Sequence, residues 1–266
     1  MLETGMDREA LVAMNGRPPI LRPGLRGQIR RKGIYLLPNL LTTGSLFAGF
    51  YAIVQAMNTR FELAAIAVFV AMVLDSLDGR VARLTRTQSE FGAAYDSLSD
   101  MVSFGAAPAL IMYEWALKDL GRLGWIAAFV YCAGAALRLA RFNANIDVVD
   151  KRFFQGLPSP AAAALVVGFI WVSDDLAIHL QHFIRGLACA VTLFAGITMV
   201  TSIHFYSFKD LNFRRSVPFW AALVMVLLLI LVSANPPIVL FGIFVAYSVS
   251  GYIMWIWNYR GSRSPF

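Results

Sequence analysis

Charged residues are scarce in this chain, and cysteine and histidine are scarcer still. Only 15% of the 266 residues are charged, whereas 58% are hydrophobic and the mean hydropathy is +0.63. A soluble domain has about half its residues apolar and about a quarter charged, so the composition excludes an ordinary soluble protein. The two cysteines, Cys132 and Cys189, lie inside apolar runs. This placement excludes a disulfide framework and a cysteine-based zinc site.

Long apolar runs are what the chain has instead. A membrane-spanning helix needs about 20 largely apolar residues, and eight runs of this kind can be counted. They lie near residues 36–57, 62–82, 92–116, 123–142, 158–176, 184–204, 217–234 and 237–257. We therefore expect an all-α fold, a polytopic membrane bundle of about eight transmembrane helices. Glycines within the runs, such as Gly134 and Gly196, predict close helix packing.

Positive charge is distributed unevenly between the connecting segments. If the N-terminus is inside, 19 of the 23 Lys and Arg residues fall on the inner side of an eight-span topology. The outer side holds only Arg60, Lys118, Arg122 and Arg185. Because positive residues accumulate on the cytoplasmic side, both termini are expected in the cytoplasm. Anionic lipid headgroups then explain the net charge of +7 without nucleic acid.

The two ends of the chain differ in composition from the apolar middle. Residues 1–34 are polar and basic and lack the apolar core of a signal peptide. We expect them to form a flexible cytoplasmic tail. Residues 35–259 are expected to form the transmembrane domain, and residues 260–266 a short cytoplasmic C-terminal tail. No internal repeat or second domain is recognisable.

Four aspartates interrupt the apolar region: Asp75, Asp78, Asp96 and Asp100. The first two are three residues apart and the last two are four apart, so each pair shares one helix face. Ionisable residues at membrane depth are costly and are candidates for a functional site. Four converging carboxylates would repel one another unless cations lay between them. Since carboxylate oxygens suit Mg²⁺ or Mn²⁺, the pattern predicts a two-metal site near the cytoplasmic membrane surface.

Other interpretations of the polar residues stay open. An aspartate pair at a helix end is often a cap or part of a salt-bridged face. Arg138 and Arg141 are either boundary anchors that reach lipid headgroups or ligands of a substrate anion. Asn39 and Asn143 either bind substrate or satisfy backbone groups at a helix end. His179 and His182 have a spacing compatible with metal binding, but a solvated outer helix is favoured for them.

The aspartates belong to a longer pattern, Asp-x2-Asp-Gly-x2-Ala-Arg-x8-Gly-x3-Asp-x3-Asp, which begins at Asp75. In this pattern the chain resembles the CDP-alcohol phosphotransferase family at all eight fixed positions. Outside the motif, about residues 33–165 are similar to the phosphatidylserine synthase branch of that family. The likeness includes the stretches Pro38–Thr42, Leu137–Asn143 and Gly156–Ala163. The resemblance implies a membrane-embedded phosphotransferase that uses a CDP-activated lipid.

The resemblance also implies roles for individual residues. Asp75, Asp78 and Asp96 would hold two divalent cations that neutralise the diphosphate of the donor. Asp100 would be the catalytic general base, with a secondary role as a metal ligand. The CDP-lipid would contact Asn39, Gly79, Ala82, Arg83 and Gly92. Here Gly79 would allow close approach of the nucleotide, and Arg83 would supply a planar cation. The acceptor would contact Arg138, Arg141 and Asn143.

The function expected from the resemblance is transfer of a phosphatidyl group from CDP-diacylglycerol to L-serine, giving phosphatidylserine and CMP. We expect a homodimer in a bacterial inner membrane, with its active site facing the cytoplasm. The nearest alternative is another acceptor, namely glycerol 3-phosphate, inositol phosphate or choline. Glycerol-phosphate transferases of the family tend to have an arginine near the position of Ser45, and its absence argues against a phosphorylated acceptor. A divalent-cation transporter and a structural lipid-binding protein are alternatives from other classes.

Overall fold

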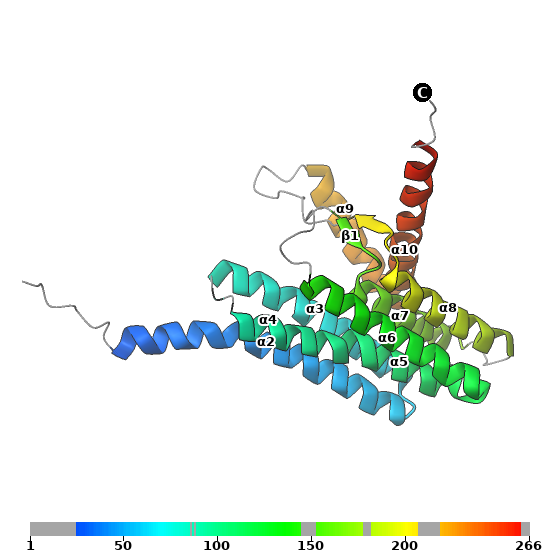
Figure 1. The fold of residues 1–266 in the computed structure, drawn as a ribbon, viewed down its shortest axis with the longest axis horizontal. Helices are drawn as coiled ribbons and strands as arrows, with labels where there is room; N and C mark the ends of the chain where they lie inside the picture. The colour runs from blue at the N-terminus through cyan, green and yellow to red at the C-terminus, as the bar shows by residue number, and fades with distance from the viewer. Residues whose placement is uncertain are drawn as a thin grey trace, which may run out of the picture.

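Helices make up most of the structure, a computed structural model that describes residues 25–85, 87, 89–144, 153–177, 182–206 and 219–261. The α-helices are α2 (Leu25–Met57), α3 (Phe61–Thr85), α4 (Glu90–Asp100), α5 (Ala107–Met112), α6 (Arg122–Ala144), α7 (Ser159–Asp175), α8 (His182–Val200), α9 (Phe219–Ala234) and α10 (Pro236–Gly261). Helices α2 to α8 form the bundle, from which α10 rises at a steep angle (Figure 1). Each of the eight predicted runs coincides with helical structure, so the positions of the helices were predicted well.

The run predicted over 92–116 is helical but is not a regular α-helix. After α4 come a π-helix, η1 (Met101–Ala106), then α5, a second π-helix, η2 (Tyr113–Leu117), and a 3-10 turn, η3 (Lys118–Leu120). Pro108 has no N–H and cannot donate to the carbonyl of Phe104 in an α-helical register. The buried hydroxyl of Tyr131 on α6 donates to that carbonyl at 3.0 Å. Pro108 thus leaves the Phe104 carbonyl without its α-helical donor, and Tyr131 supplies a donor where the π-helix η1 replaces regular α-helix.

Two strands of three residues each are exceptions within the described residues, and the structure is otherwise helical, in agreement with the expected all-α fold. Strand β1 (Phe153–Gln155) pairs antiparallel with β2 (His204–Tyr206), so the connection before α7 is tied to the chain after α8. Gly156 follows β1 with φ of +78°, and a Cβ at this position would collide with the carbonyl of Met199. Glycine is therefore required there. The strands were missed because three residues are too short to show an alternating pattern.

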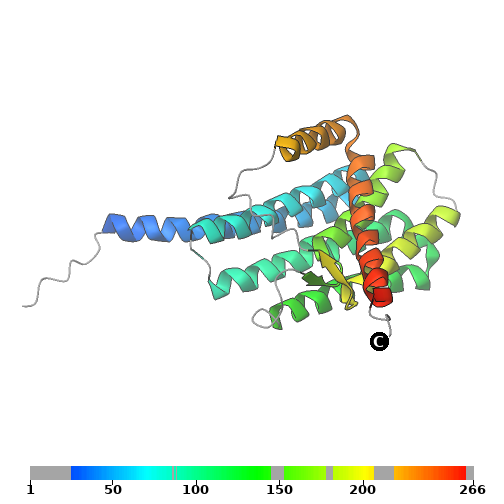
Figure 2. The same ribbon diagram turned by 90° about the horizontal axis from the view of Figure 1, so that it is seen from above.

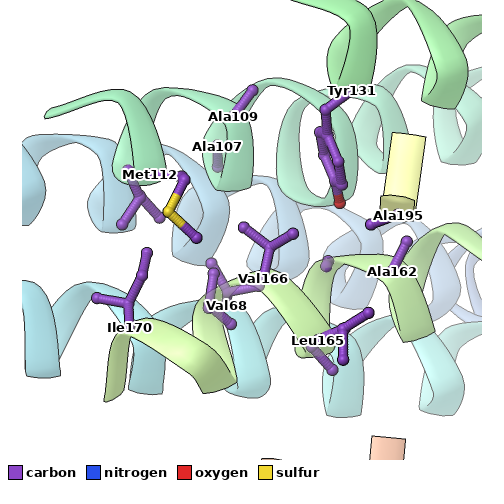
Figure 3. Packing of buried hydrophobic residues seen from close by; sticks show 14 of the residues in the cluster. Val68, Ala107, Ala109, Met112, Tyr131, Ala162, Leu165, Val166, Ile170 and Ala195 are labelled. Atoms are coloured by element: carbon purple, nitrogen blue, oxygen red, sulfur yellow. The ribbon is translucent and has the colours of Figure 1, made fainter. Parts of the chain in front are cut away.

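The core is built from apolar side chains on α2, α3, α5, α6, α7 and α8 and on the π-helices η1 and η2 (Figure 3). Its buried members include Val68, Met112, Tyr131, Val166, Ile170 and Ala195. Helix α7 is buried along nearly its whole length because its alanine-rich sequence lets neighbours approach from every side. Gly134 on α6 packs directly against the backbone of Gly196 on α8. The prediction that these glycines serve helix packing is confirmed.

Four helices are long and apolar enough to cross a membrane by length and composition. They are Leu37–Met57 within α2, Arg122–Ala144 (α6), His182–Val200 (α8) and Pro236–Trp257 within α10. Among the other described helices, α3 has the aspartate motif in its second half, α7 has only 17 residues, and the apolar part of α9 is short. The structure therefore gives four candidate spans where eight were expected.

The structure adds one observation at the N-terminal end of the expected transmembrane domain. Helix α2 begins at Leu25, so the helix extends into the segment expected to be a flexible tail. Residues 1–24 lie outside the described part of the chain, as do residues 262–266 beyond α10. Helix α9 contacts mainly α10 and exposes apolar residues along its length. Figure 2 shows α9 at the edge of the molecule, whereas α10 runs across the bundle and packs against α7.

Candidate metal centre and substrate pocket

Three of the four aspartates converge where α3 ends and α4 begins. Asp75 and Asp78 lie in the second half of α3, and Asp96 lies in α4. One carboxylate oxygen from each lies within 4.8 Å of the others. The two helices are joined by only a few residues, so the short connection brings the two halves of the motif together (Figure 1). Their predicted convergence is confirmed.

Asp78 is held by a neighbour that the sequence analysis did not single out as a site residue. It is only 4% exposed, and the hydroxyl of Thr42 on α2 donates to its Oδ2 at 2.7 Å. Ser99 on α4 donates in turn to the backbone carbonyl of Thr42 at 3.1 Å. These contacts fix α2, α3 and α4 relative to one another at the motif. The available signal was spacing, because Thr42 is one helical turn after Asn39.

Asp100 stands beside the triad rather than in it. Its carboxyl is close enough to Asp75 for a side-chain hydrogen bond and lies within electrostatic range of Asp96 and Arg138. The π-helix η1 begins immediately after it. Such a π-helical segment is frequent at functional sites.

The chemistry of the aspartate group fits a divalent cation. An oxygen of Asp96 and an oxygen of Asp100 are buried without a hydrogen-bond partner. Buried carboxylate oxygens are costly without a partner, and close like charges raise that cost. Hard divalent cations prefer oxygen donors of this kind. The acidic triad can therefore bind a metal ion.

A pocket of about 320 Å³ opens on one side of the triad. Its lining includes four residues that were predicted to contact the CDP-lipid: Asn39, Gly79, Ala82 and Gly92. Asp78 and Asp96 form part of the same wall, together with Thr87 and Ser89, which the sequence analysis did not name. Ser89 caps α4 by accepting a hydrogen bond from the Gly92 backbone N–H at 3.0 Å. The motif positions that lack large side chains thus gather around one cavity.

The two motif glycines contribute to the pocket differently. A Cβ on Gly79 would meet no protein atom within 4 Å, so protein packing does not require glycine there. A Cβ on Gly92 would lie 3.1 Å from Ser89 Oγ and 3.5 Å from Asn39 Oδ1. Gly92 therefore keeps α2 and α4 close, whereas Gly79 leaves its surface open toward the pocket.

Arg83 is placed differently from what the motif suggested. Its Nε donates to the carbonyl of Gly79 at 2.9 Å, within its own helix. The side chain is exposed and does not line the pocket, and no ion pair joins it to a described carboxylate. Its contact with a CDP-lipid stays a prediction, because in this structure its Nε bonds within α3.

The predicted acceptor residues on α6 are separated by the structure. Arg138 Nη1 donates to Ser159 Oγ on α7 at 2.8 Å, while its Nε is buried without a partner. Asn143 donates through Nδ2 to Ser97 Oγ on α4 at 3.1 Å. Arg141 makes no hydrogen bond or ion pair with a described residue. Of the two arginines, only Arg138 lies in electrostatic range of Asp100.

Of the two histidines considered as ligands, His182 is described and does not belong to the aspartate cluster. His182 is exposed at the start of α8, and His179 lies outside the described residues. Among the described residues, the metal-type cluster consists of the three aspartates alone. The expectation that the histidines belong to the outer surface is compatible with the exposure of His182.

These features define a helical membrane protein with an acidic, metal-type site beside a pocket. The sequence model of the CDP-alcohol phosphatidyltransferase family matches residues 35–197, which include the whole site. The chain belongs to this family. The match covers α2 through most of α8, whereas α9 and α10 lie beyond it.

Several proteins similar to this chain carry the name CDP-diacylglycerol–serine O-phosphatidyltransferase. The protein of that name from Helicobacter pylori strain J99 is 36% identical over 230 residues, which cover 84% of this chain and 92% of the relative. The Mycobacterium tuberculosis H37Rv protein is 40% identical over 147 residues, covering 53% of this chain and 51% of the relative. The Saccharomyces cerevisiae protein is 38% identical over 141 residues, covering 47% and 50% respectively.

Proposed function

We propose that this protein transfers the phosphatidyl group of CDP-diacylglycerol to the hydroxyl of L-serine, producing phosphatidylserine and CMP. The observation that carries the proposal is the placement of two distinct sets of groups around the aspartates. The open pocket with Gly79 and Gly92 lies on one side of Asp78 and Asp96, and Arg138 approaches Asp100 outside that pocket. The names of the relatives supply the particular donor and acceptor.

The donor headgroup is proposed to occupy the pocket lined by Asn39, Gly79, Ala82 and Gly92. The missing side chain at Gly79 lets the nucleotide approach the helix backbone. Asp75, Asp78 and Asp96 would hold two divalent ions, Mg²⁺ or Mn²⁺, as further members of this site. Bound there, the ions would supply neutralisation of the diphosphate charge. Arg83 is assigned to the mouth of the pocket, where its charge attracts phosphate.

The acceptor is proposed to bind between Asp100 and Arg138. Serine brings a hydroxyl and a carboxylate, which match the unpartnered carboxylate oxygen of Asp100 and the unpartnered Nε of Arg138. Asp100 takes the hydroxyl proton as the serine oxygen attacks the phosphorus that carries diacylglycerol. A new P–O bond forms to serine, the bond to the CMP oxygen breaks, and CMP leaves with the electron pair. Asn143 orients α4 through Ser97, and Arg141 serves the headgroup region.

A phosphorylated acceptor is the second candidate within the family. The argument from Ser45 is weaker than the sequence suggested, because Ser45 is buried and donates to the Ala71 carbonyl at 3.0 Å. This position faces α3 rather than the pocket, so its identity does not report on the acceptor. The preference for serine therefore rests on the names of the relatives and not on the residue at position 45.

The placement in the membrane is also a proposal. The charge bias along the chain supports an eight-span topology with the active site at the cytoplasmic face. The bacterial relatives support insertion in a bacterial inner membrane. In this arrangement residues 1–34 and 260–266 are cytoplasmic and residues 35–259 form the catalytic membrane domain. We further propose a homodimer, for which mass measurement of the detergent-solubilised protein is the direct test.

The reaction is tested by incubating the purified protein with CDP-diacylglycerol, Mg²⁺ or Mn²⁺, and one acceptor at a time. We expect CMP release with L-serine and formation of a serine-containing phospholipid. Glycerol 3-phosphate, inositol phosphate and choline should give little CMP. CMP release with one of these acceptors and not with serine would overturn the serine assignment. If no acceptor gives CMP release, the proposal that the protein is a phosphatidyl transferase is wrong.

A further inference from the structure

Arg138 lies in a position that is unfavourable for a cation unless an anion joins it. Its Nη1 is bonded to Ser159, its Nε is buried without a partner, and it forms no ion pair with a described carboxylate. Ser159 is the first residue of α7, and the N-terminal end of a helix carries partial positive charge. Burying a guanidinium there is costly without a compensating negative group. Asp100 is a negative group in electrostatic range of Arg138 but forms no ion pair with it, so the buried Nε–H of Arg138 is left available to an anionic ligand.

We infer that Ser159 is a positioning residue, whose hydroxyl holds the Arg138 guanidinium so that its Nε faces the carboxylate of an amino-acid acceptor. Ser159 is fully buried, so bulk water does not compete with its hydroxyl for the Arg138 guanidinium. A guanidinium is planar, and fixing one nitrogen of the group restricts the orientation of the others. This inference rests on the proposed function, because it concerns the same acceptor.

The arrangement also defines the class of acceptor. Asp100 and Arg138 are in electrostatic range, and each has a buried atom without a partner. A β-hydroxy-α-amino acid presents a hydroxyl to one and a carboxylate to the other. An amino alcohol such as ethanolamine would leave the buried Nε unpaired, and sites built to hydrogen-bond a group reject analogues that lack it. Ser159 thus contributes to specificity without touching the reacting atoms.

The test is the Ser159→Ala variant in the full-length protein, assayed by CMP release. We expect the KM for L-serine to rise about tenfold, because a hydrogen bond to a charged group is lost. The KM for CDP-diacylglycerol and the metal dependence should stay unchanged. Ser159→Thr keeps the hydroxyl and should restore most of the serine affinity.

Ser173→Ala is the matched control on the same helix. Ser173 is also buried, but its hydroxyl donates to the carbonyl of Phe169 at 2.8 Å, within α7 itself. Its loss should leave the KM for serine unchanged even where Tm falls. Should Ser159→Ala not fold, Ser159→Cys has similar volume and a weaker acceptor, and the same KM comparison applies.

Equal effects of Ser159→Ala and Ser173→Ala on the serine KM would overturn the inference, and so would an equal rise in the KM for CDP-diacylglycerol. The outcome is separable from that of the proposed function. If the wild-type protein releases CMP only with a phosphorylated acceptor, the serine assignment fails. The effect of Ser159→Ala on the KM for that acceptor then still decides whether Ser159 positions Arg138 toward an anion.

Discussion

Asp96 is the residue at which the metal proposal is most directly tested. It joins α4 to the two aspartates of α3, and one of its oxygens is buried without a protein partner. Asp96→Asn should lower kcat/KM by several orders of magnitude, because a charged ligand is lost from the centre of the site. Excess EDTA should abolish CMP release, and added Mg²⁺ or Mn²⁺ should restore it.

The matched control is Asp174→Asn, which removes an exposed carboxylate at the end of α7 and should leave activity unchanged. Full activity in excess EDTA would contradict metal dependence. A fully active Asp96→Asn variant would contradict its role as a ligand, whatever the effect of chelation.

Thr42 acts on the site through Asp78. Thr42→Val keeps the shape of the side chain but removes the hydrogen bond to the carboxylate. Groups that orient a metal ligand typically change metal affinity or activity by about 10- to 100-fold when lost. We therefore expect a higher metal concentration for half-maximal activity, with rescue by Thr42→Ser. Thr43→Val is the control, since its hydroxyl is exposed and meets Tyr95 instead. Equal metal dependence in both valine variants would argue against the orienting role.

A substitution at Gly79 should change substrate binding without lowering protein stability. Because a Cβ there meets no protein atom within 4 Å, Gly79→Ala should leave Tm unchanged or slightly higher. The added methyl would occupy space proposed for the nucleotide, so the KM for CDP-diacylglycerol should rise about tenfold or more, since about tenfold is the lower end of the effect of one methylene. Gly242→Ala on α10 also adds a methyl to open space and should change neither value. An unaltered KM in Gly79→Ala would remove the argument for close nucleotide approach.

The sequence predicted the site best where residue type alone decides the chemistry. The spacing of Asp75, Asp78 and Asp96 in two helices with a short connection predicted convergence, and the structure places them together. Arg83 was harder because a long side chain reaches several partners, and it bonds to its own helix. Ser159 was not predicted as a site residue because its contact with Arg138 joins positions far apart in sequence.

At the scale of helices, the crossing of α6 and α8 depends on Gly196. A Cβ at Gly196 would lie 2.7 Å from the Cα of Tyr131, a backbone atom that cannot move independently. Gly196→Ala should therefore lower Tm, at a cost of about 1–3 kcal/mol for overpacking. Gly186→Ala lies on the same helix, where a Cβ meets no atom within 4 Å, and should leave Tm unchanged. Similar Tm values for the two variants, measured in the same detergent, would contradict the close crossing.

Helix positions were predictable from apolar length, whereas departures from regular helix were not. The run over 158–176 matches α7 within one residue at each end, because Pro160 opens the helix and the apolar sequence ends at Asp174 and Asp175. In the π-helix η1 after Asp100, the hydroxyl of Tyr131 on α6 donates to the carbonyl of Phe104. Sequence periodicity does not reveal a contact of this kind. The β1–β2 ladder similarly arises from pairing between segments on either side of α7 and α8.

At the scale of the whole molecule, the packed bundle and the α9–α10 hairpin have different environments. Helices α2, α3, α5, α6, α7 and α8 and the two π-helices supply the buried core, whereas most of the large apolar side chains of α9 are exposed. Helix α10 is anchored by packing on α7 and through Gly251, which lies against the ring of Phe205 in β2. An exposed apolar helix of this kind requires lipid or another protein surface around it. The hairpin is therefore where the membrane topology has to be determined.

Single cysteines at Ser89 and Asn235 provide that determination, after Cys132 and Cys189 are replaced by alanine. Ser89 caps α4 beside the pocket, and Asn235 forms the turn between α9 and α10. The eight-span proposal places Ser89 on the cytoplasmic face and Asn235 on the opposite face, because the Lys and Arg residues before α9 and after α10 both remain inside. A membrane-impermeant thiol reagent applied to intact cells should label Asn235→Cys, and Ser89→Cys should react only in inverted vesicles. If both cysteines react from the cytoplasmic face, the eight-span topology is wrong and the α9–α10 hairpin does not cross the membrane. Figure 1 shows α10 at a steep angle to the bundle, which makes the hairpin the part of the topology that most needs this test.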